Sequence, residues 1–565
     1  MRLAVLSDHA DQKLCSLLQR GLASWNSSAS VYRSDFEDIS LEVLHADSAM
    51  YAFQPEVVYL NLSTQGIRDR FYAAQPAGRS DVFRDVMEDL SRWLGILLQK
   101  NFQVVVNLLP APVERHCGSF SACLAGSLPN QIRAINHAIV TEIAGREGVL
   151  VNDLAHLSAS IGLRQWYDER FWCHSKYPCR PPLLACYADS LMAVLKAWRG
   201  RDLIKCIITD LDNTLWHGII GDDGLDGIEV GGVGVGEAHQ RYQHYLLTLK
   251  QQGIILCVCS KNEEAAARLP FQKHSGMVLK ESDFACFMAN WKPKSENIRA
   301  MAAELNLGLD SFVFVDDSAF EREEVRSALP EVNVPEFPED ASGICALLEN
   351  LPGLETATRP TEEDLRRTAL YQVERQRSLL ESQFTSREDF LGGLEMTGVF
   401  APVGDAEISR AAQLIQRSNQ FNLRTQRLGT EQLRALASST SGFACFCSLR
   451  DRFGDHGIIA VLCGEVREAG STVWITEWVM SCRVLGRGVE EFIRNHLVTT
   501  ARAMNCTKLV GEYLPTEKNA MVAGLYERLG FTRISDGTAR FELQVDTATR
   551  LPNFINSQSS LTSSI

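Results

Sequence analysis

Two aspartates, Asp210 and Asp212, are the residues whose type and spacing best suit chemistry in this sequence. Asp210 ends the apolar, β-branched run Cys206–Asp210, and Asp212 follows two residues later. The run predicts a buried strand of a parallel sheet. On an extended chain, side chains at i and i+2 point to the same side. One carboxylate can attack phosphorus while the other donates a proton to the leaving oxygen. The pair predicts phosphoryl transfer, although a capped strand end gives the same short pattern.

Later segments supply the groups that two carboxylates alone lack. Ser260 ends a second apolar run, Lys292 and Lys294 occur in Lys-Pro-Lys, and Asp316 and Asp317 end the run FVFVDD. A hydroxyl and a lysine neutralise transferring oxygens, and further carboxylates hold Mg²⁺. Because open α/β sheets place their chemistry at the carboxyl ends of the strands, these segments predict one phosphoryl-transfer centre.

The elements that must position these residues alternate between strands and helices over residues 201–350. A turn-rich insertion, residues 221–236, follows the first strand. The other expected elements are strands at Ile254–Cys259, Met277–Leu279 and Phe312–Val315, and helices at Glu237–Gln252, Lys261–Leu269 and Asn297–Leu305.

The flanking regions predict two further domains, so the chain is expected to be a multidomain α/β protein. Residues 1–200 read as a small parallel α/β domain, with strands at Leu3–Leu6, Val57–Leu60, Val104–Leu108 and Leu150–Asn152 and helices at Asp81–Gln99 and Leu128–Gly145. Residues 395–550 read as α+β, with helices at Ile408–Ser418 and Gly488–Ala503 and strands at Gly442–Cys447, Gly457–Cys463 and Thr472–Val479. Residues 351–394 read as a linker and a charged helix capped by Thr361, and residues 551–565 as a disordered tail.

Composition excludes several classes of protein. The formal net charge of −14 argues against nucleic-acid binding, although residues 401–540 hold 17 basic and 14 acidic residues and would suit an anionic partner. The 16 cysteines are dispersed and form no Cys-x-x-Cys, which favours reduced, buried thiols. The sequence has no long apolar span and no signal-peptide pattern, so we expect a cytoplasmic protein.

The four chemical segments together resemble the haloacid dehalogenase (HAD) superfamily. That resemblance implies that Asp210 is the phosphorylated nucleophile and Asp212 the acid/base. It also implies that Mg²⁺ is held by Asp210, the Asp212 carbonyl and Asp317, with Asp316 nearby.

The same resemblance assigns the phosphate-binding groups. It implies that Ser260 and Lys292 grip the phosphate, and Lys292 is preferred to Lys294 because the superfamily lysine often precedes proline. Further substrate contacts are expected from Thr214, Asn262 and Lys294.

Longer segments narrow the resemblance to the FkbH-like family of glyceryl transferase/phosphatases: DLDNTLWHGIIGDDG, VCSKNEEAA, NWKPKSENIRAMAAELNLGLDSFVFVDDSAFERE and SNQFNLRTQR. The family implies that the acyl phosphate of 1,3-bisphosphoglycerate is captured as a thioester and that the 3-phosphate is removed. The glyceryl group then passes to the phosphopantetheine of an acyl carrier protein in polyketide biosynthesis. Cys259 is the candidate acyl acceptor, and inert packing is the alternative because strand alternation points it away from Ser260.

Each flanking domain also carries a resemblance. Arg483, Gly486 and Gly488 resemble the pyrophosphate loop of GNAT acyltransferases, where they would bind coenzyme A or the phosphopantetheine arm of the carrier. The N-terminal strand order resembles an SGNH-hydrolase sheet, but Ser7-Asp8 lacks the Gly-Asp-Ser motif and Asp168 lies six residues before His174. We therefore expect a non-catalytic N-terminal domain. A stand-alone Mg²⁺-dependent phosphatase and a non-enzymatic docking scaffold for a carrier protein are the alternatives.

Overall fold

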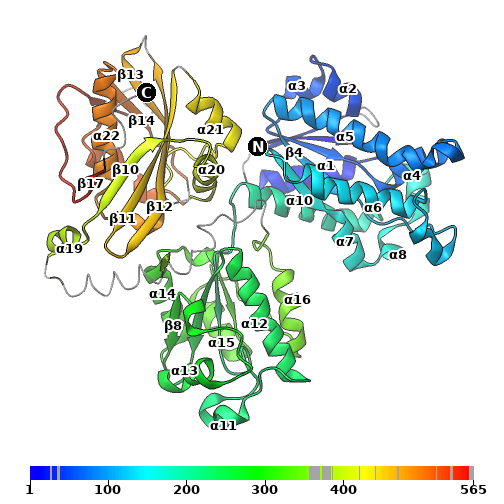
Figure 1. The fold of residues 1–565 in the computed structure, drawn as a ribbon, viewed down its shortest axis with the longest axis horizontal. Helices are drawn as coiled ribbons and strands as arrows, with labels where there is room; N and C mark the ends of the chain where they lie inside the picture. Colours follow the sequence, from blue (N-terminus) through cyan, green and yellow to red (C-terminus); the bar gives the residue numbers. More distant parts are fainter. Residues whose placement is uncertain are drawn as a thin grey trace. The chain divides into compact units, whose positions relative to one another are not determined.

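The computed structural model describes residues 1–565 except 26–27, 35–38, 356–369, 372–383, 385, 419, 440, 468–469, 517, 535–538 and 559–565. It contains three β-sheets, each with its own helices (Figure 1), and so confirms the multidomain α/β class. The predicted helix capped by Thr361 lies outside the described residues. No helix in the described part of the chain is both long enough and apolar enough to cross a membrane.

Residues Met1–Trp198 form a compact unit around a parallel five-stranded sheet in the order β2-β1-β3-β4-β5. The strands are β1 (Arg2–Ser7), β2 (Ser30–Arg33), β3 (Val57–Asn61), β4 (Gln103–Leu108) and β5 (Val149–Asp153). The helices are α1 (Gln12–Ala23), α2 (Ile39–Leu44), α3 (Ala49–Phe53), α4 (Thr64–Ala73), α5 (Val82–Gln99), α6 (Leu128–Ala138), α7 (Leu154–Ile161), α8 (Leu163–Trp166), α9 (Glu169–Ser175) and α10 (Leu184–Trp198).

Both faces of this first sheet are covered by helices (Figure 1). Alternate residues of β1 therefore enter different cores: Ala4 and Leu6 pack on one side, and Leu3 and Val5 on the other. This double burial explains why the strands read as continuous apolar runs. The short strand β2 is absent from the sequence prediction.

The second sheet is parallel and has the order β8-β7-β6-β9. Its strands are β6 (Cys206–Thr209), β7 (Ile255–Ser260), β8 (Cys286–Ala289) and β9 (Phe312–Val315). Its helices are α11 (Ile220–Gly227), α12 (Val235–Gln251), α13 (Glu264–Lys273), α14 (Lys294–Leu305), α15 (Ala319–Ala328) and α16 (Ile344–Glu349). The chain runs from β6 through β7 to β8 on one side and then crosses to β9 on the other. The switch point between β6 and β9 is the position where open α/β sheets bind ligands.

One strand predicted for this region is wrong. Met277–Leu279 is not a strand, and the edge strand is Cys286–Ala289, which pairs with β7 in the register Cys257↔Cys286. Both stretches are short and apolar, so periodicity alone does not separate them. The insertion predicted to be rich in turns also contains helix α11.

The third sheet has eight strands in the order β15-β16-β14-β13-β12-β11-β10-β17. They are β10 (Thr397–Pro402), β11 (Gly442–Asp451), β12 (Gly454–Arg467), β13 (Thr472–Met480), β14 (Lys508–Glu512), β15 (Thr532–Arg533), β16 (Arg540–Gln544) and β17 (Asn556–Ser557). The helices are α19 (Arg387–Gly393), α20 (Ile408–Arg417), α21 (Thr430–Ala437), α22 (Val489–Ala503) and α23 (Leu525–Arg528). This mixture of antiparallel strands and helices is the α+β arrangement that the sequence predicts.

Strands β13 and β14 are parallel neighbours over only part of their length. Their pairing ends at Ile475↔Gly511, and beyond it the segment Phe421–Leu423 lies along β13. The amide of Leu423 donates to the carbonyl of Trp478 at 3.3 Å, and the Leu423 carbonyl accepts from the amide of Leu514, just after β14, at 2.9 Å. The chain itself therefore fills the space where the two strands separate.

The prediction of a disordered tail from residue 551 needs correction. Ile555 is buried, and Asn556–Ser557 forms β17, which pairs in parallel with Thr397 and Gly398 of β10. The amide of Asn556 donates to the carbonyl of Met396 at 2.9 Å. An apolar side chain and one strand pair thus attach this segment to the sheet, while residues 559–565 lie outside the described part.

Candidate active site

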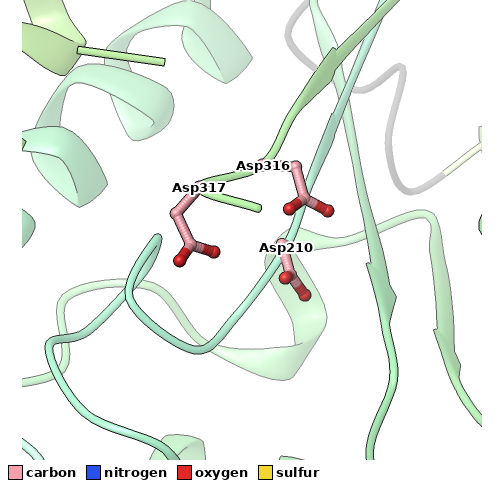
Figure 2. Close-up of side chains that lie close together, drawn as sticks. All are labelled: Asp210, Asp316 and Asp317. Carbon is pink, nitrogen blue, oxygen red and sulfur yellow. The ribbon is translucent and has the colours of Figure 1, made fainter. Parts of the chain in front are cut away.

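Three carboxylates meet at the switch point of the second sheet. Asp210 follows β6, and Asp316 and Asp317 follow the adjacent strand β9, so the parallel pairing brings them together (Figure 2). One oxygen from each lies within 4.8 Å of the others. Asp210 and Asp316 are buried and Asp317 is half-buried. The predicted convergence of the two aspartate segments is therefore present in the structure.

The cation of this cluster is Lys294. Its Nζ lies 2.8 Å from Oδ2 of Asp210 and 2.5 Å from Oδ2 of Asp316, and the side chain is 2% exposed. Burial alone would lower the pKa of Lys294, but the two carboxylates outweigh that effect and raise it above its ordinary value. The ammonium therefore stays charged.

The preference for Lys292 over Lys294 is wrong. Helix α14 begins at Lys294, after Pro293 at the N-cap, and this start directs the Lys294 side chain towards the carboxylates. Lys292 is exposed, and its backbone amide donates to Oδ1 of Asn290 at 3.0 Å. The position of the helix start, one residue after the proline, decides which lysine contacts the carboxylates.

The carboxylates suit a hard divalent cation. Oδ1 of Asp210 is buried without a hydrogen-bond partner in the described part of the chain. Burial, reinforced by the charge of Asp210, raises the pKa of Asp316 to about 7 and also raises the pKa of Asp317. Both effects express an excess of buried negative charge that an oxygen-liganded cation would relieve.

Asp212 lies outside this cluster and has its own set of donors. Its Oδ1 accepts from Nε1 of Trp216 at 2.9 Å and from the amide of Ile220 at 3.0 Å. Its Oδ2 accepts from Nδ2 of Asn262 at 2.8 Å. Asp212 is half-buried, and these bonds fix the orientation of its carboxyl group.

The predicted substrate contacts Thr214 and Asn262 both form hydrogen bonds with neighbouring residues of the site. Thr214 is fully buried, and its hydroxyl accepts from the amide of Asp317 at 3.3 Å, so its assignment as a substrate contact is wrong. Asn262 is buried and uses its amide on Asp212 and, at 3.2 Å, on the hydroxyl of Ser260. Ser260 itself lies at the tip of β7, as predicted.

Arg322 is a residue that the sequence reasoning missed. It is buried on α15, and its Nη1 donates to the carbonyl of Asp316 at 2.9 Å and to that of Asp317 at 2.7 Å. Ser318 caps the same helix by accepting from the amide of Glu321. The sequence signal for Arg322 was its position four residues after Ser318, the serine that follows Asp316-Asp317.

The assignment of Cys259 as acyl acceptor is not supported by the structure. The thiol is wholly buried, where it packs with residues such as Ile298 and Met301. Burial raises the pKa of Cys259 to about 12. The thiolate is the reactive form, so a buried thiol with this pKa is inert at neutral pH.

The predicted loop of the third sheet lies between β13 and α22. Gly486 and Gly488 adopt positive φ values of 75° and 78°, which favour glycine. Gly486 is exposed, and its carbonyl accepts from Nη2 of Arg387 at 2.7 Å. Arg483 is instead buried and donates from Nε to the hydroxyl of Ser481 at 3.2 Å, and its assignment as an arm-binding residue stays a prediction.

In the first unit, the residues examined for hydrolase chemistry make structural contacts. Ser7 donates to Oδ2 of Asp11 at 2.7 Å and accepts from Nδ2 of Asn61 at 2.9 Å. Asp168 caps α9 and pairs with Arg170, and His174 is exposed. These contacts agree with the expectation of a broken catalytic set, and the non-catalytic role stays a prediction.

The fold and the site define a multidomain α/β protein with a buried aspartate–lysine centre at a parallel-sheet switch point. The family described as "FkbH, N-terminal domain" matches residues 2–196. The crystal structure of the N-terminal part of BF1531 from Bacteroides fragilis, containing a phosphatase domain complexed with Mg, is 31% identical with a TM-score of 0.60. That match covers 63% of this chain and 94% of that chain. The chain belongs to the FkbH-like family.

Two acetyltransferase structures are also similar to part of the chain. Spermidine N-acetyltransferase from Vibrio cholerae in complex with CoA and spermine is 12% identical, with 27% of this chain and 98% of that chain covered and a TM-score of 0.21. The ribosomal-protein-S18-alanine N-acetyltransferase from Escherichia coli is 13% identical, with 30% and 100% covered and a TM-score of 0.21. No curated protein matches the chain.

Proposed function

We propose that the chain is a Mg²⁺-dependent phosphatase and glyceryl transferase. It would load a glyceryl unit from 1,3-bisphosphoglycerate onto an acyl carrier protein in polyketide biosynthesis. The observation that carries the proposal is Asp210, a buried carboxylate with one oxygen held by Lys294 and the other without a partner in the described structure. Membership of the FkbH-like family and similarity to a phosphatase domain support it.

Asp210 and Asp212 divide the phosphatase chemistry. A carboxylate oxygen of Asp210 attacks the phosphorus of the 3-phosphate, forming an aspartyl-phosphate as the bond to the substrate oxygen breaks. Asp212 gives its proton to that oxygen and then takes a proton from the water that hydrolyses the intermediate. The contacts of Asp212 with Trp216, Ile220 and Asn262 keep its carboxyl in one orientation for both steps.

Positive charge is needed where the phosphoryl group is transferred. Asp210, Asp316 and Asp317 would hold Mg²⁺ together with the carbonyl of Asp212, and the ion when bound would neutralise phosphoryl oxygens. Lys294 supplies a permanent charge beside Asp210. Arg322 fixes the backbone that carries Asp316 and Asp317.

The acyl transfer needs no aspartate. The phosphopantetheine thiolate attacks the carboxyl carbon of the acyl phosphate, the carbon–sulfur bond forms, and orthophosphate leaves with the electron pair of the carbon–oxygen bond. An acyl phosphate is activated enough for this attack. Because Cys259 is buried, the carrier thiol rather than a thiol of this strand is the acceptor we propose.

The alternative is a stand-alone Mg²⁺-dependent phosphatase, and the burial of Cys259 is the observation that favours it. A docking scaffold without activity fits less well. Such a protein has no physical need for three carboxylates within 4.8 Å of one another at a strand tip, because their mutual repulsion is unfavourable.

Intact-mass spectrometry tests the proposal. The protein is incubated with 1,3-bisphosphoglycerate, Mg²⁺ and a phosphopantetheinylated carrier, and the wild type should leave a glyceryl thioester on the carrier. Asp210→Asn should leave a phosphoglyceryl adduct, because only the phosphatase step is lost. Complete dephosphorylation by Asp210→Asn would overturn the site assignment. Phosphate release with no adduct on either protein would establish the stand-alone phosphatase.

A further inference from the structure

Large apolar side chains lie exposed around the carboxyl end of the second sheet. Among the described residues 201–354, the large hydrophobic side chains that are exposed are Ile219 at 42%, Val233 at 98%, Trp291 at 68% and Phe320 at 73%. Ile219, Trp291 and Phe320 follow β6, β8 and β9, whose carboxyl ends form the edge that bears the aspartates. We call these three residues the apolar rim.

Trp291 is connected to the acid/base carboxyl through two neighbouring residues. Its Nε1 donates to Oε1 of Glu263 at 3.4 Å, and the adjacent Asn262 donates to Asp212 at 2.8 Å. The indole therefore lies beside the loop that orients Asp212, while most of its surface faces solvent.

Phe320 follows β9 and Ile219 follows β6, and both lie next to residues that contact the site. Nζ of Lys261, the residue after Ser260, lies 6.0 Å from the centroid of the Phe320 ring and 2.7 Å from Oε1 of Glu321. Ile219 precedes Ile220, whose amide donates to Asp212 at 3.0 Å. Each rim residue is thus within a few residues of a group that contacts the catalytic carboxylates.

Exposed aromatic and aliphatic side chains beside a polar centre indicate a ligand with an apolar part. Free 3-phosphoglycerate is small and charged throughout, so it would gain nothing from an indole and a phenyl ring. A pantetheine chain has aliphatic segments and a dimethyl group, which would bury these rings. Binding energy of this kind, remote from the reacting phosphate, can position a substrate for reaction.

We propose that the apolar rim binds the pantetheine arm of a phosphoglyceryl thioester, so that the 3-phosphate is removed after the acyl group has been loaded. This inference rests on the proposed function and names its substrate: a phosphomonoester on a pantetheine thioester. Asp212 and Asp317 are half-buried, so part of each residue is exposed to solvent.

Competing substrates test the inference. Phosphate release is measured for S-(3-phosphoglyceryl)pantetheine and for free 3-phosphoglycerate, and the ratio of their kcat/KM values is compared between variants. The wild type should prefer the thioester. Trp291→Ala and Phe320→Ala should each lower that preference by roughly tenfold, chiefly through KM, as expected for the loss of one buried ring. Val233→Ala removes an exposed apolar side chain outside the rim and should leave the ratio unchanged.

A binding measurement distinguishes failure of this inference from failure of the proposed function. Calorimetry measures the affinity of the wild type and of Trp291→Ala for the amide analogue of the thioester, which keeps both phosphate and arm. If the analogue binds the wild type more tightly than Trp291→Ala and neither substrate is hydrolysed, the role of the apolar rim is supported and the phosphatase activity is overturned. Hydrolysis of both compounds with a ratio that Trp291→Ala and Phe320→Ala do not change would overturn the rim and keep the phosphatase.

Discussion

The ammonium of Lys294 lies 2.8 Å from Oδ2 of Asp210, and both groups are withdrawn from solvent. Removing one partner of a buried ion pair is unfavourable, because the remaining charge has no water to solvate it. The same contact leaves Oδ1 of Asp210 as the oxygen without a hydrogen bond in the described structure. The lysine therefore anchors Asp210 through one oxygen and leaves the other without a hydrogen bond.

Lys294→Met should abolish phosphate release and lower stability. Loss of the ammonium leaves Asp210 and Asp316 facing each other unpaired, which should cost about 3 kcal/mol, and removes charge stabilisation worth a factor of about 10² or more in kcat. Phosphate release and thermal unfolding are the measurements. Lys292→Met is the matched control, because Lys292 is exposed and should lose neither. Equal losses in both variants would contradict the assignment of Lys294.

Asn262→Ala should reduce phosphate release in a way that depends on the leaving group. The variant removes the 2.8 Å hydrogen bond that orients Asp212, so proton delivery to the leaving oxygen becomes inefficient. An alkyl phosphate needs that proton and should slow by about tenfold or more, whereas p-nitrophenyl phosphate leaves as a stabilised anion and should slow less. Rates with the two substrates are compared. An equal loss for both would mean that Asn262 acts through the fold alone.

Cys259→Ala should retain both phosphate release and loading of the carrier. With a pKa of about 12, raised by burial, the thiol at pH 8 is ionised in roughly one molecule in 10⁴. The variant loses packing in the core, at a cost of about 1 kcal/mol. Intact-mass analysis of the carrier and thermal unfolding check both expectations. Loss of loading with a normal unfolding temperature would restore Cys259 as acyl acceptor.

The strand tips were predictable because apolar runs ending in aspartates leave little choice of structure. Cys206–Asp210 and Phe312–Val315 contain the strands β6 and β9, and the carboxylates after them converge as expected. Pairing of parallel strands then fixes their proximity. The acidic half of the site is therefore encoded locally.

The basic half and the buried positions depend on features that the sequence does not state. Whether Lys292 or Lys294 enters the site depends on the residue at which α14 begins, and Lys-Pro-Lys fits either choice. The sequence does not show that the hydroxyl of Thr214 accepts a hydrogen bond from the amide of Asp317. Strand β14 (Lys508–Glu512) escaped prediction because its short run, KLVGE, shows neither clear alternation nor length.

A buried carboxyl in the third sheet gives a prediction on pH. Glu477 of β13 is wholly buried; its Oε2 accepts from the amide of Gln426 at 3.0 Å, and its Oε1 has no partner in the described residues. Burial raises the pKa of Glu477 to about 7. Between pH 4.5, its ordinary pKa, and about pH 7 the unfolded state loses the proton that the folded state keeps, so stability falls as pH rises.

Glu477→Gln removes this titration, so it should stabilise the third sheet relative to the wild type, little at pH 4.5 and by up to about 3 kcal/mol at pH 7.5. Hydrogen exchange of Thr472–Met480 in the full chain measures the difference, with both proteins compared at the same pH so that intrinsic exchange cancels. Glu465→Gln on the neighbouring strand β12, where the side chain is half-buried, is the control and should change protection equally at both pH values. Protection in Glu477→Gln that tracks the wild type across this range would show that Glu477 titrates alike in both states.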